Sequence, residues 1–348
     1  MVLLVVLALS AALAWGGCVW LQQRALEQVL NVEDELLLDV ASGSTPSGLL
    51  TRLEEQNVLE NAFWLRVYWR LNHAQDTVHK GEYRLIKGMT VEQLLAAWRS
   101  GEVVQYSVTL VPGWNVRQLR AALLQQEALD NTLKDQSDAA LLKAIGAKHS
   151  HPEGLFFPDT YRYVRGMKDT DLLKQAYQRL MHVLDEEWQG RAADLPYQEP
   201  YQALIMASII ERETGVAHER AEIAGVFVRR LKLGMLLQTD PTVIYGMGEN
   251  YKGKITRADL RTPTPYNTYV NQGLTPTPIA LVGREAIHAA LHPKAGKSLY
   301  FVARGDGTHV FSATLDEHNK AVREYQLKRR SDYRSSPAPR ATEQGAPK

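Results

Sequence analysis

The sequence contains a single cysteine, Cys18, and almost no excess of charge of either sign. One cysteine excludes an intramolecular disulfide and a cysteine-rich zinc site. The 40 lysine and arginine residues balance 39 aspartate and glutamate residues, which gives a formal net charge of +1. Nucleic-acid-binding proteins usually carry a strong basic excess, so we do not expect nucleic acid as a partner. With 45% apolar and 23% charged residues, the 348-residue chain has the composition of a folded protein of about two domains.

Charge is also absent from the first 23 residues, MVLLVVLALSAALAWGGCVWLQQ. The apolar part, about 21 residues, would span about 31 Å as a helix, close to the roughly 30 Å core of a bilayer. We therefore expect a transmembrane anchor over residues 1–22 and a linker over 23–34, with the rest of the chain outside the cytoplasm. Two alternatives stay open. A signal peptide cleaved after Ala14 would have an unusually long apolar region and no basic start, and a lipoprotein signal ending at Cys18 would have Trp15 where a small aliphatic residue is expected.

Between Leu36 and about Gln126, one pattern occurs three times: an extended apolar run, a turn rich in Pro, Gly, Ser or Thr, and a short amphipathic helix. The segments are LLLDVASGSTPSGLLTRLEEQ, GEYRLIKGMTVEQLLAAWRSGEV and YSVTLVPGWNVRQLRAALLQQ. In the second, Thr90 is a candidate N-cap and Gly101 a candidate helix stop. Such units suit a small α+β binding module. A plain spacer remains the alternative, because the three segments lack a strict period.

From Gly154 onward, the pattern changes to long helices separated by turn-rich loops. We expect an amphipathic helix in TDLLKQAYQRLMHVLDEEW, a fully buried one in ALIMASIIERET and a third in ERAEIAGVFVRRLKLG. Loops are expected in LQTDPTVIYGMG and TPTPYNTYVNQGLTPTPIA, a helix over 284–291, and then a hairpin that turns at Asp306-Gly307. The polar tail, residues 328–348, should be disordered. The expected fold class is α+β, with a mixed helix and strand domain over 113–327.

Two histidines, His288 and His292, lie four residues apart and so share one helix face, a spacing that can hold a metal. The glutamate that follows the first histidine in the zinc-protease motif is missing, so an ordinary surface pair is favoured. The loop HSHPEG (149–154) is no stronger, because two loop histidines alone rarely close a metal site. We expect neither a metal nor a cofactor.

Two carboxylates, Glu211 and Glu213, end the apolar stretch ALIMASIIERET. Residues two apart on a helix point about 200° apart, so the two acids cannot line one cleft if the helix runs through both. Gly215 predicts the helix end, and the macrodipole disfavours a carboxylate in the last turn by roughly 0.3–1 kcal/mol. Burial acts in the same direction, and an acid that stays protonated near neutral pH suits general-acid catalysis. The structural alternative is that both acids pair with Arg212 and Arg220 where a core helix surfaces.

The two loops that follow carry the groups that a sugar-binding groove uses, namely amides, hydroxyls and carboxylates beside flat aromatic faces. QTDPTVIYG and TPYNTY hold most of them. The candidates for orienting a glycan strand are Glu213, Gln238, Asp240, Tyr266 and Asn267. A structural role is the alternative for each, because hydrogen-bonded loop residues are common without a ligand.

Four stretches together resemble the motifs of the endolytic murein transglycosylase (YceG-like) family: LFFPDTY (155–161), ASIIERET (207–214), LQTDPTVIYGMG (237–248) and TPYNTY…GLTPTPIA (265–280). Their order and spacing match, and the resemblance extends from the N-terminal apolar run to about residue 327. It implies an inner-membrane protein with one span and its catalytic part in the periplasm. It also implies a LysM-like module over 35–112 and a lytic transglycosylase domain over 113–327. The uncharged N-terminus departs from the short basic stub that is usual in the family.

The resemblance places the catalytic glutamate, the first acid of the family's I-I/V-E-x-E-T motif, at Glu211. It implies cleavage of the β-1,4 bond between N-acetylmuramic acid and N-acetylglucosamine within peptidoglycan strands. The C6 hydroxyl of the muramic acid would act as the nucleophile, so that the product ends in a 1,6-anhydro ring and one carboxylate suffices. Membrane-bound peptidoglycan synthases are the expected partners. A hydrolase that uses Glu213 or Asp240 as a second carboxylate and a non-enzymatic wall-binding anchor remain as alternatives.

Overall fold

The computed structural model describes residues 2–327, and its fold is mixed α+β with an N-terminal apolar helix. The chain divides into two compact units. The N-terminal unit comprises the residues up to Ser107 together with Gln126–Asp130 and Arg162–Lys168. The C-terminal unit comprises Val108–Gln125, Asn131–Tyr161 and the chain from Asp169 onward. The expected tail, residues 328–348, lies outside the described residues.

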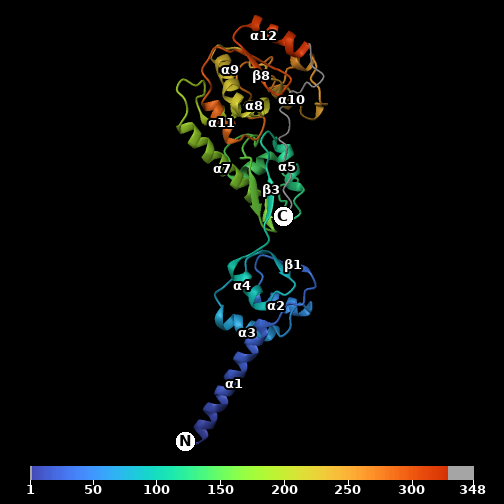
Figure 1. Ribbon diagram of the computed structural model, residues 1–348, viewed down its shortest axis with the longest axis vertical. Coiled ribbons are helices and arrows are strands. Elements are labelled where there is room, and N and C mark those ends of the chain that lie inside the picture. Colours follow the sequence, from blue (N-terminus) through green and yellow to red (C-terminus); the bar gives the residue numbers. More distant parts are fainter. Residues whose placement is uncertain (1, 328–348) are drawn as a thin grey trace. The chain divides into compact units, whose positions relative to one another are not determined.

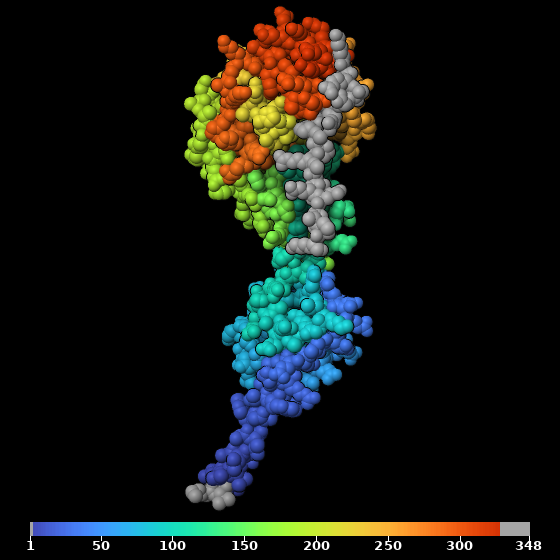
Figure 2. All heavy atoms as spheres, in the orientation of Figure 1, coloured from blue at the N-terminus to red at the C-terminus, as the bar shows by residue number. Residues whose placement is uncertain are grey.

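The N-terminal helix α1 spans Val2–Glu27 and projects from the N-terminal unit as a single rod, blue in Figure 2. Its segment Leu3–Glu27 is long enough to cross a membrane and has a mean hydropathy of 2.1, with none of its most apolar window buried. An N-terminal signal sequence passes the same test. Beyond the apolar run, Ala25, Leu26 and Leu30 are buried in the core of the unit. In the segment 23–34, expected as a linker, the first five residues are therefore the end of α1, and part of the segment packs into the core of the unit.

The rest of the N-terminal unit surrounds a two-stranded antiparallel sheet in which Glu35 of β1 lies opposite Ile86 of β2. Helix α4 begins with a capping box formed by Thr90 and Gln93 and ends at Gly101 in the left-handed conformation, as predicted. The core is built on apolar side chains from α1 to α4 and from strands β1 and β2, including the fully buried Trp98. The elements are β1 (Glu35–Val40), α2 (Pro46–Glu55), α3 (Ala62–Asn72), β2 (Gly81–Ile86), α4 (Val91–Ser100), β4 (Leu129–Asp130) and β6 (Met167–Lys168). The last two form a short parallel pair.

The C-terminal unit is built around the buried helix α8, against which α7, α9 and α11 pack (Figure 1). Every residue from Ala203 to Ile210 is buried, as the uninterrupted apolar run predicted. Strand β3 (Tyr106–Thr109) pairs with β5 (Thr160–Tyr163), and each of these two strands contributes residues to both units. The helices are α5 (Val116–Leu124), α6 (Asp138–Ile145), α7 (Asp169–Gln189), α8 (Pro200–Glu213), α9 (Arg220–Lys232), α10 (Asp240–Met247), α11 (Arg284–Leu291) and α12 (Leu315–Val322). Short 3-10 turns cover Ala217–Glu219, Gly248–Asn250 and Asp259–Arg261, and a π turn covers Arg323–Leu327.

The stretch LQTDPTVIYGMG, expected to be a loop, contains helix α10, so this prediction is wrong. Proline in the first turn of a helix costs no hydrogen bond, because the amides there have no partner within the helix. Asp240 stands in the same turn, where the helix dipole favours an acidic side chain. The residues that suggested a loop therefore mark the start of a helix.

The predicted C-terminal hairpin is confirmed. Strands β7 (Tyr300–Ala303) and β8 (His309–Ser312) are antiparallel, with Ala303 opposite His309. In the turn between them, the Asp306 carboxylate accepts hydrogen bonds from the backbone amide and the hydroxyl of Thr308.

Candidate functional site

The last turn of α8 directs three charged side chains to three different sides. The Glu211 carboxylate contacts the backbone of Gly283, Arg212 donates to the carbonyl oxygen of Gly113, and Glu213 accepts from the hydroxyl of Thr239. The two glutamates therefore diverge, as their spacing predicted. Of the predicted arginine partners, Arg220 contacts Glu211, whereas Arg212 bonds to a backbone carbonyl instead.

The Glu211 side chain is only 8% exposed. Its Oε2 accepts a hydrogen bond of 3.0 Å from the backbone amide of Gly283, the residue that precedes helix α11. For its Oε1, the described part of the chain provides an ionic contact of 3.8 Å with Arg220. Burial raises the pKa of the Glu211 carboxyl and the nearby Glu285 adds to the rise, while the Gly283 amide and Arg220 oppose it. Glu211 is thus a desolvated acid with one oxygen anchored by the Gly283 amide and the other in a longer ionic contact with Arg220.

Arg220 is shared between Glu211 and the exposed Glu285, with which it forms a close ion pair. Since its positive charge lowers the pKa of Glu211, Arg220→Gln should raise that pKa further. A reaction that needs protonated Glu211 should then persist to higher pH. We expect the alkaline limb of the pH–rate profile of Arg220→Gln to shift to higher pH. The control Lys232→Gln, which breaks the ion pair with Asp194, should leave the limb at its original pH. An unmoved or lowered limb in the Arg220 variant would show that Arg220 does not tune the acid.

A polar cluster gathers on the Glu213 side of α8. The Thr239 hydroxyl donates to Glu213, and burial, reinforced by the negative charge of Asp240, raises the pKa of Glu213 to about 7. Asp240 accepts a hydrogen bond of 2.6 Å from the hydroxyl of Tyr269. Gln238 has a left-handed backbone conformation with φ of 52°, and its backbone amide donates a hydrogen bond to the backbone carbonyl of Thr268. The structure thus brings together three of the predicted substrate-binding residues: Glu213, Gln238 and Asp240.

The remaining two predicted substrate-binding residues lie in a different setting. Asn267 is 1% exposed; its Nδ2 donates to three backbone carbonyls, at 259, 260 and 262, and its Oδ1 accepts from the amide of Tyr269. These bonds hold the loop together, so the geometry favours a structural role for Asn267. The hydroxyl of Tyr266 bonds to that of Thr277, and its ring packs edge-on against Tyr245 at 4.7 Å.

A cavity of about 780 Å³ opens beside α8 in the C-terminal unit, lined by Arg212, Tyr245 and Glu153 among others. Sequence reasoning missed Glu153, although an acid between proline and glycine just before the apolar LFF run was an available signal. Glu153 is 3% exposed and accepts hydrogen bonds from the amides of Val116 and Gly154 and from the hydroxyl of Tyr245. Burial raises its pKa to about 7.

The raised pKa of Glu153 has a consequence for stability. The folded protein holds this proton more tightly than the unfolded chain does, so the stabilisation is complete below about pH 4.5 and is lost as the pH rises through about 7. A rise from 4.5 to about 7 corresponds to roughly 3 kcal/mol. Glu153→Gln cannot ionise, so its free energy of unfolding should fall less than that of the wild type between pH 5 and pH 8. Urea titrations at both pH values measure this difference, and parallel curves for the two proteins would contradict it.

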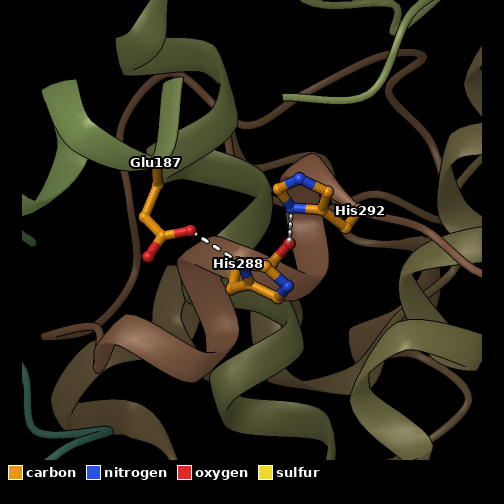
Figure 3. Close-up of side chains that lie close together, drawn as sticks. All are labelled: Glu187, His288 and His292. Carbon is orange, nitrogen blue, oxygen red and sulfur yellow. Dashed lines mark hydrogen bonds and ion pairs between the residues drawn. The ribbon is translucent and has the colours of Figure 1, made fainter. Parts of the chain in front are cut away.

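Figure 3 shows the two histidines considered for a metal, together with Glu187 of α7, which pairs with His288. Their ligand atoms lie within 4.8 Å of one another, but several of these atoms already have partners within the protein. Glu187 accepts from Arg284 and pairs with Nδ1 of His288, and both ring nitrogens of His292 contact backbone carbonyls. The rings of the two histidines stack at 4.1 Å. This arrangement favours an ion-pair network that ties α7 to α11.

The comparisons with known proteins agree with one another. The model of the YceG-like family matches residues 38–324. The chain is 33% identical over 335 residues to the endolytic murein transglycosylase of Bacillus subtilis (strain 168), covering 89% of this chain and 90% of that protein. It is 25% identical over 360 residues to the protein of the same name from Streptococcus pneumoniae serotype 2 (strain D39), covering 92% of this chain and 64% of that protein.

A solved structure gives the same result. The crystal structure of a YceG-like protein from Listeria monocytogenes matches with a TM-score of 0.52 at 29% identity, covering 83% of this chain and 99% of that one. The family match extends over most of the sequence and includes the end of α8, the cluster around Glu213 and the cavity beside Arg212. The chain therefore belongs to the YceG-like family.

Proposed function

We propose that this protein is an endolytic murein transglycosylase, with Glu211 as its single catalytic acid and base. The names of its relatives support the general activity. The observation that carries the residue assignment is the environment of Glu211, a buried carboxyl with a raised pKa, one oxygen anchored by the Gly283 amide and the other without a hydroxyl donor among the described residues. Its substrate is the β-1,4 bond between N-acetylmuramic acid and N-acetylglucosamine inside a glycan strand.

In the first step, protonated Glu211 donates its proton to the glycosidic oxygen. The bond from that oxygen to C1 of the muramic acid breaks, the N-acetylglucosamine end departs with a free hydroxyl, and C1 acquires oxocarbenium character. A carboxyl with a raised pKa is protonated in more of the molecules near neutral pH than an ordinary one, which favours this step. The Arg220 cation and the Gly283 amide then stabilise the carboxylate that is left.

In the second step, the Glu211 carboxylate takes the proton of the C6 hydroxyl of the same muramic acid. That oxygen attacks C1 and closes a 1,6-anhydro ring, which returns Glu211 to its protonated form. The overall reaction consumes no water, because the C6 hydroxyl of the substrate is the nucleophile. Glycosidases that use water or a covalent intermediate need a second carboxylate.

Three other acids of this unit each accept a hydrogen bond from a hydroxyl group. Thr239 donates to Glu213, Tyr269 to Asp240 and Tyr245 to Glu153. Glu211 differs from them because it accepts no hydrogen bond from a hydroxyl among the described residues, and a lytic cut needs only this one acid, so we favour the lytic mechanism over a muramidase that hydrolyses the bond. We assign Glu213, Gln238 and Asp240, together with Tyr266, to the orientation of the glycan strand.

We further propose that α1 anchors the protein in the inner membrane, with both units in the periplasm. The N-terminal unit would act as a LysM-like module over about residues 35–112. In support, its β2 and α4 border a cavity of about 850 Å³ that carries Arg84, Gln93 and Gln105, side chains able to bond to sugar hydroxyls. A membrane-held enzyme that cuts new strands along their length would end strand elongation beside membrane-bound peptidoglycan synthases.

The products of digestion test the proposal. Purified peptidoglycan treated with the detergent-solubilised protein should yield muramic ends that are lighter by one water than hydrolysed ends and resist reduction, because the cut conserves mass. Mass spectrometry before and after borohydride treatment separates the cases. Reducible ends as the main product would establish a hydrolase, and the absence of any released fragment would establish a wall-binding protein without this activity.

A further inference from the structure

Helix α3 of the N-terminal unit is apolar on two opposite sides. Its inner side, formed by Ala62, Leu65 and Trp69, is buried in the core. On the outer side, Phe63, Val67 and Leu71 follow at intervals of four residues and so form one continuous stripe. Phe63 and Leu71 are 58% and 67% exposed. We call these three residues the α3 stripe, and no described residue covers them fully.

The position of α3 relative to α1 is fixed by hydrogen bonds. The side chain of Gln28, the residue after α1, donates from Nε2 to the carbonyl of Glu60 at 2.7 Å and accepts at Oε1 from the amide of Glu60 at 2.8 Å. The two helices also pack against each other, and Ala25 and Leu26 are buried there. The first turn of α3, with Phe63 in it, therefore lies beside the point where α1 ends.

This point coincides with the expected edge of a bilayer. Arg24 is the first charged residue of the chain, and Trp20 and Arg24 form a cation–π pair at 5.5 Å, with Trp20 exposed. Tryptophan and arginine side chains are typical of the membrane interface. From Arg24 to Gln28 the chain rises by about 6 Å, and the headgroup layer is roughly 5–8 Å thick on each side. The start of α3 is thus level with the lipid headgroups.

We propose that the α3 stripe is a second membrane contact, through which the N-terminal unit lies on the lipid surface with α3 in the headgroup layer. The inference rests on the proposed anchor, which brings the surface to this height. Apolar side chains at this depth enter the boundary between headgroups and acyl chains. Arg70, exposed on the same side of α3, would face the lipid phosphates. The contact would limit the tilt of the unit about α1 and so set the height at which it meets glycan strands.

The test uses the full-length protein in nanodiscs of phosphatidylethanolamine and phosphatidylglycerol that carry a nitroxide quencher near the headgroup. A fluorescent probe is attached at native Cys18 or, in a Cys18→Ser background, at Leu71→Cys. Leu37→Cys is the matched control, because Leu37 is also an exposed leucine of this unit, 42% exposed. It lies in β1, which Figure 1 shows farther from α1 than α3 is.

We expect strong quenching at positions 18 and 71 and only the quenching of a water-exposed dye at position 37. Quenching at position 18 without quenching at position 71 would overturn the proposal and leave the anchor intact. A stripe that binds a protein partner instead of lipid would remain in water, because the nanodisc contains no such partner. Absence of quenching at 18 would overturn the anchor and the lipid contact together. Catalytic activity does not enter this measurement, so failure of the transglycosylase assignment is recognised separately by the product analysis.

Discussion

Replacing Glu211 by glutamine should reduce the release of glycan fragments by at least about 10²-fold, the usual scale for the loss of a general acid. Glutamine has nearly the same shape, and its carbonyl oxygen can still accept the hydrogen bond from the Gly283 amide. The protein should therefore keep its melting temperature while it loses the titratable proton. Fragment release from purified peptidoglycan and thermal unfolding of the same preparation measure the two quantities.

Glu213→Gln is the matched control, since it makes the same change two residues away on the same helix. It should reduce activity less, and its effect on stability should be larger than that of Glu211→Gln, because Glu213 is held by the Thr239 hydroxyl within a buried cluster. If Glu213→Gln abolished fragment release and Glu211→Gln did not, the roles of the two acids would be reversed.

The largest effect on stability is expected at Asn267. Asn267→Ala removes the bonds to the carbonyls at 259, 260 and 262 and to the amide of Tyr269, and leaves these backbone groups without their partner. At about 1 kcal/mol for each net hydrogen bond, the free energy of unfolding should fall by about 3 kcal/mol or more. Urea unfolding followed by circular dichroism gives the value.

Asn271→Ala provides the control for this change. Asn271 lies in the same loop and donates to the carbonyls of Thr264 and Asn267, but its side chain is exposed, so water can replace the lost bonds. Its cost should stay below about 1 kcal/mol. A stable Asn267→Ala protein that has lost activity would instead support the contact with substrate that the sequence suggested for this residue.

Two helices, one in each unit, could be predicted because each has a one-dimensional signal. In the C-terminal unit, the run Ala203–Ile210 of α8 is apolar on all sides and proved fully buried. In the N-terminal unit, Thr90 and Gly101 mark both ends of α4 through capping alone. The divergence of Glu211 and Glu213 also followed from helix geometry. These signals need no knowledge of what the helix packs against.

The partners of the site residues could not be predicted in the same way. Glu211 meets Gly283 across 72 residues of sequence, and Glu153 meets Tyr245 across 92. No local pattern records such pairs, since they depend on which helices become neighbours. The prediction of a loop around Asp240 was wrong for a different reason. Proline and glycine are common both in loops and at helix ends, and only the packed structure distinguishes the two.

The N-terminal unit is assembled from three separated pieces of chain, and this limits how it can be transplanted. A gene fragment that stops at Ser107 omits Arg162–Lys168, which belong to the same unit. In that fragment, the buried Glu82, which accepts a hydrogen bond from the Tyr106 hydroxyl, would lose its ion pair with Arg165. A buried carboxylate stripped of its partner is strongly destabilising. A fragment that is to be grafted onto another protein should therefore include the later segments, Gln126–Asp130 and Arg162–Lys168, joined to it by a short connector.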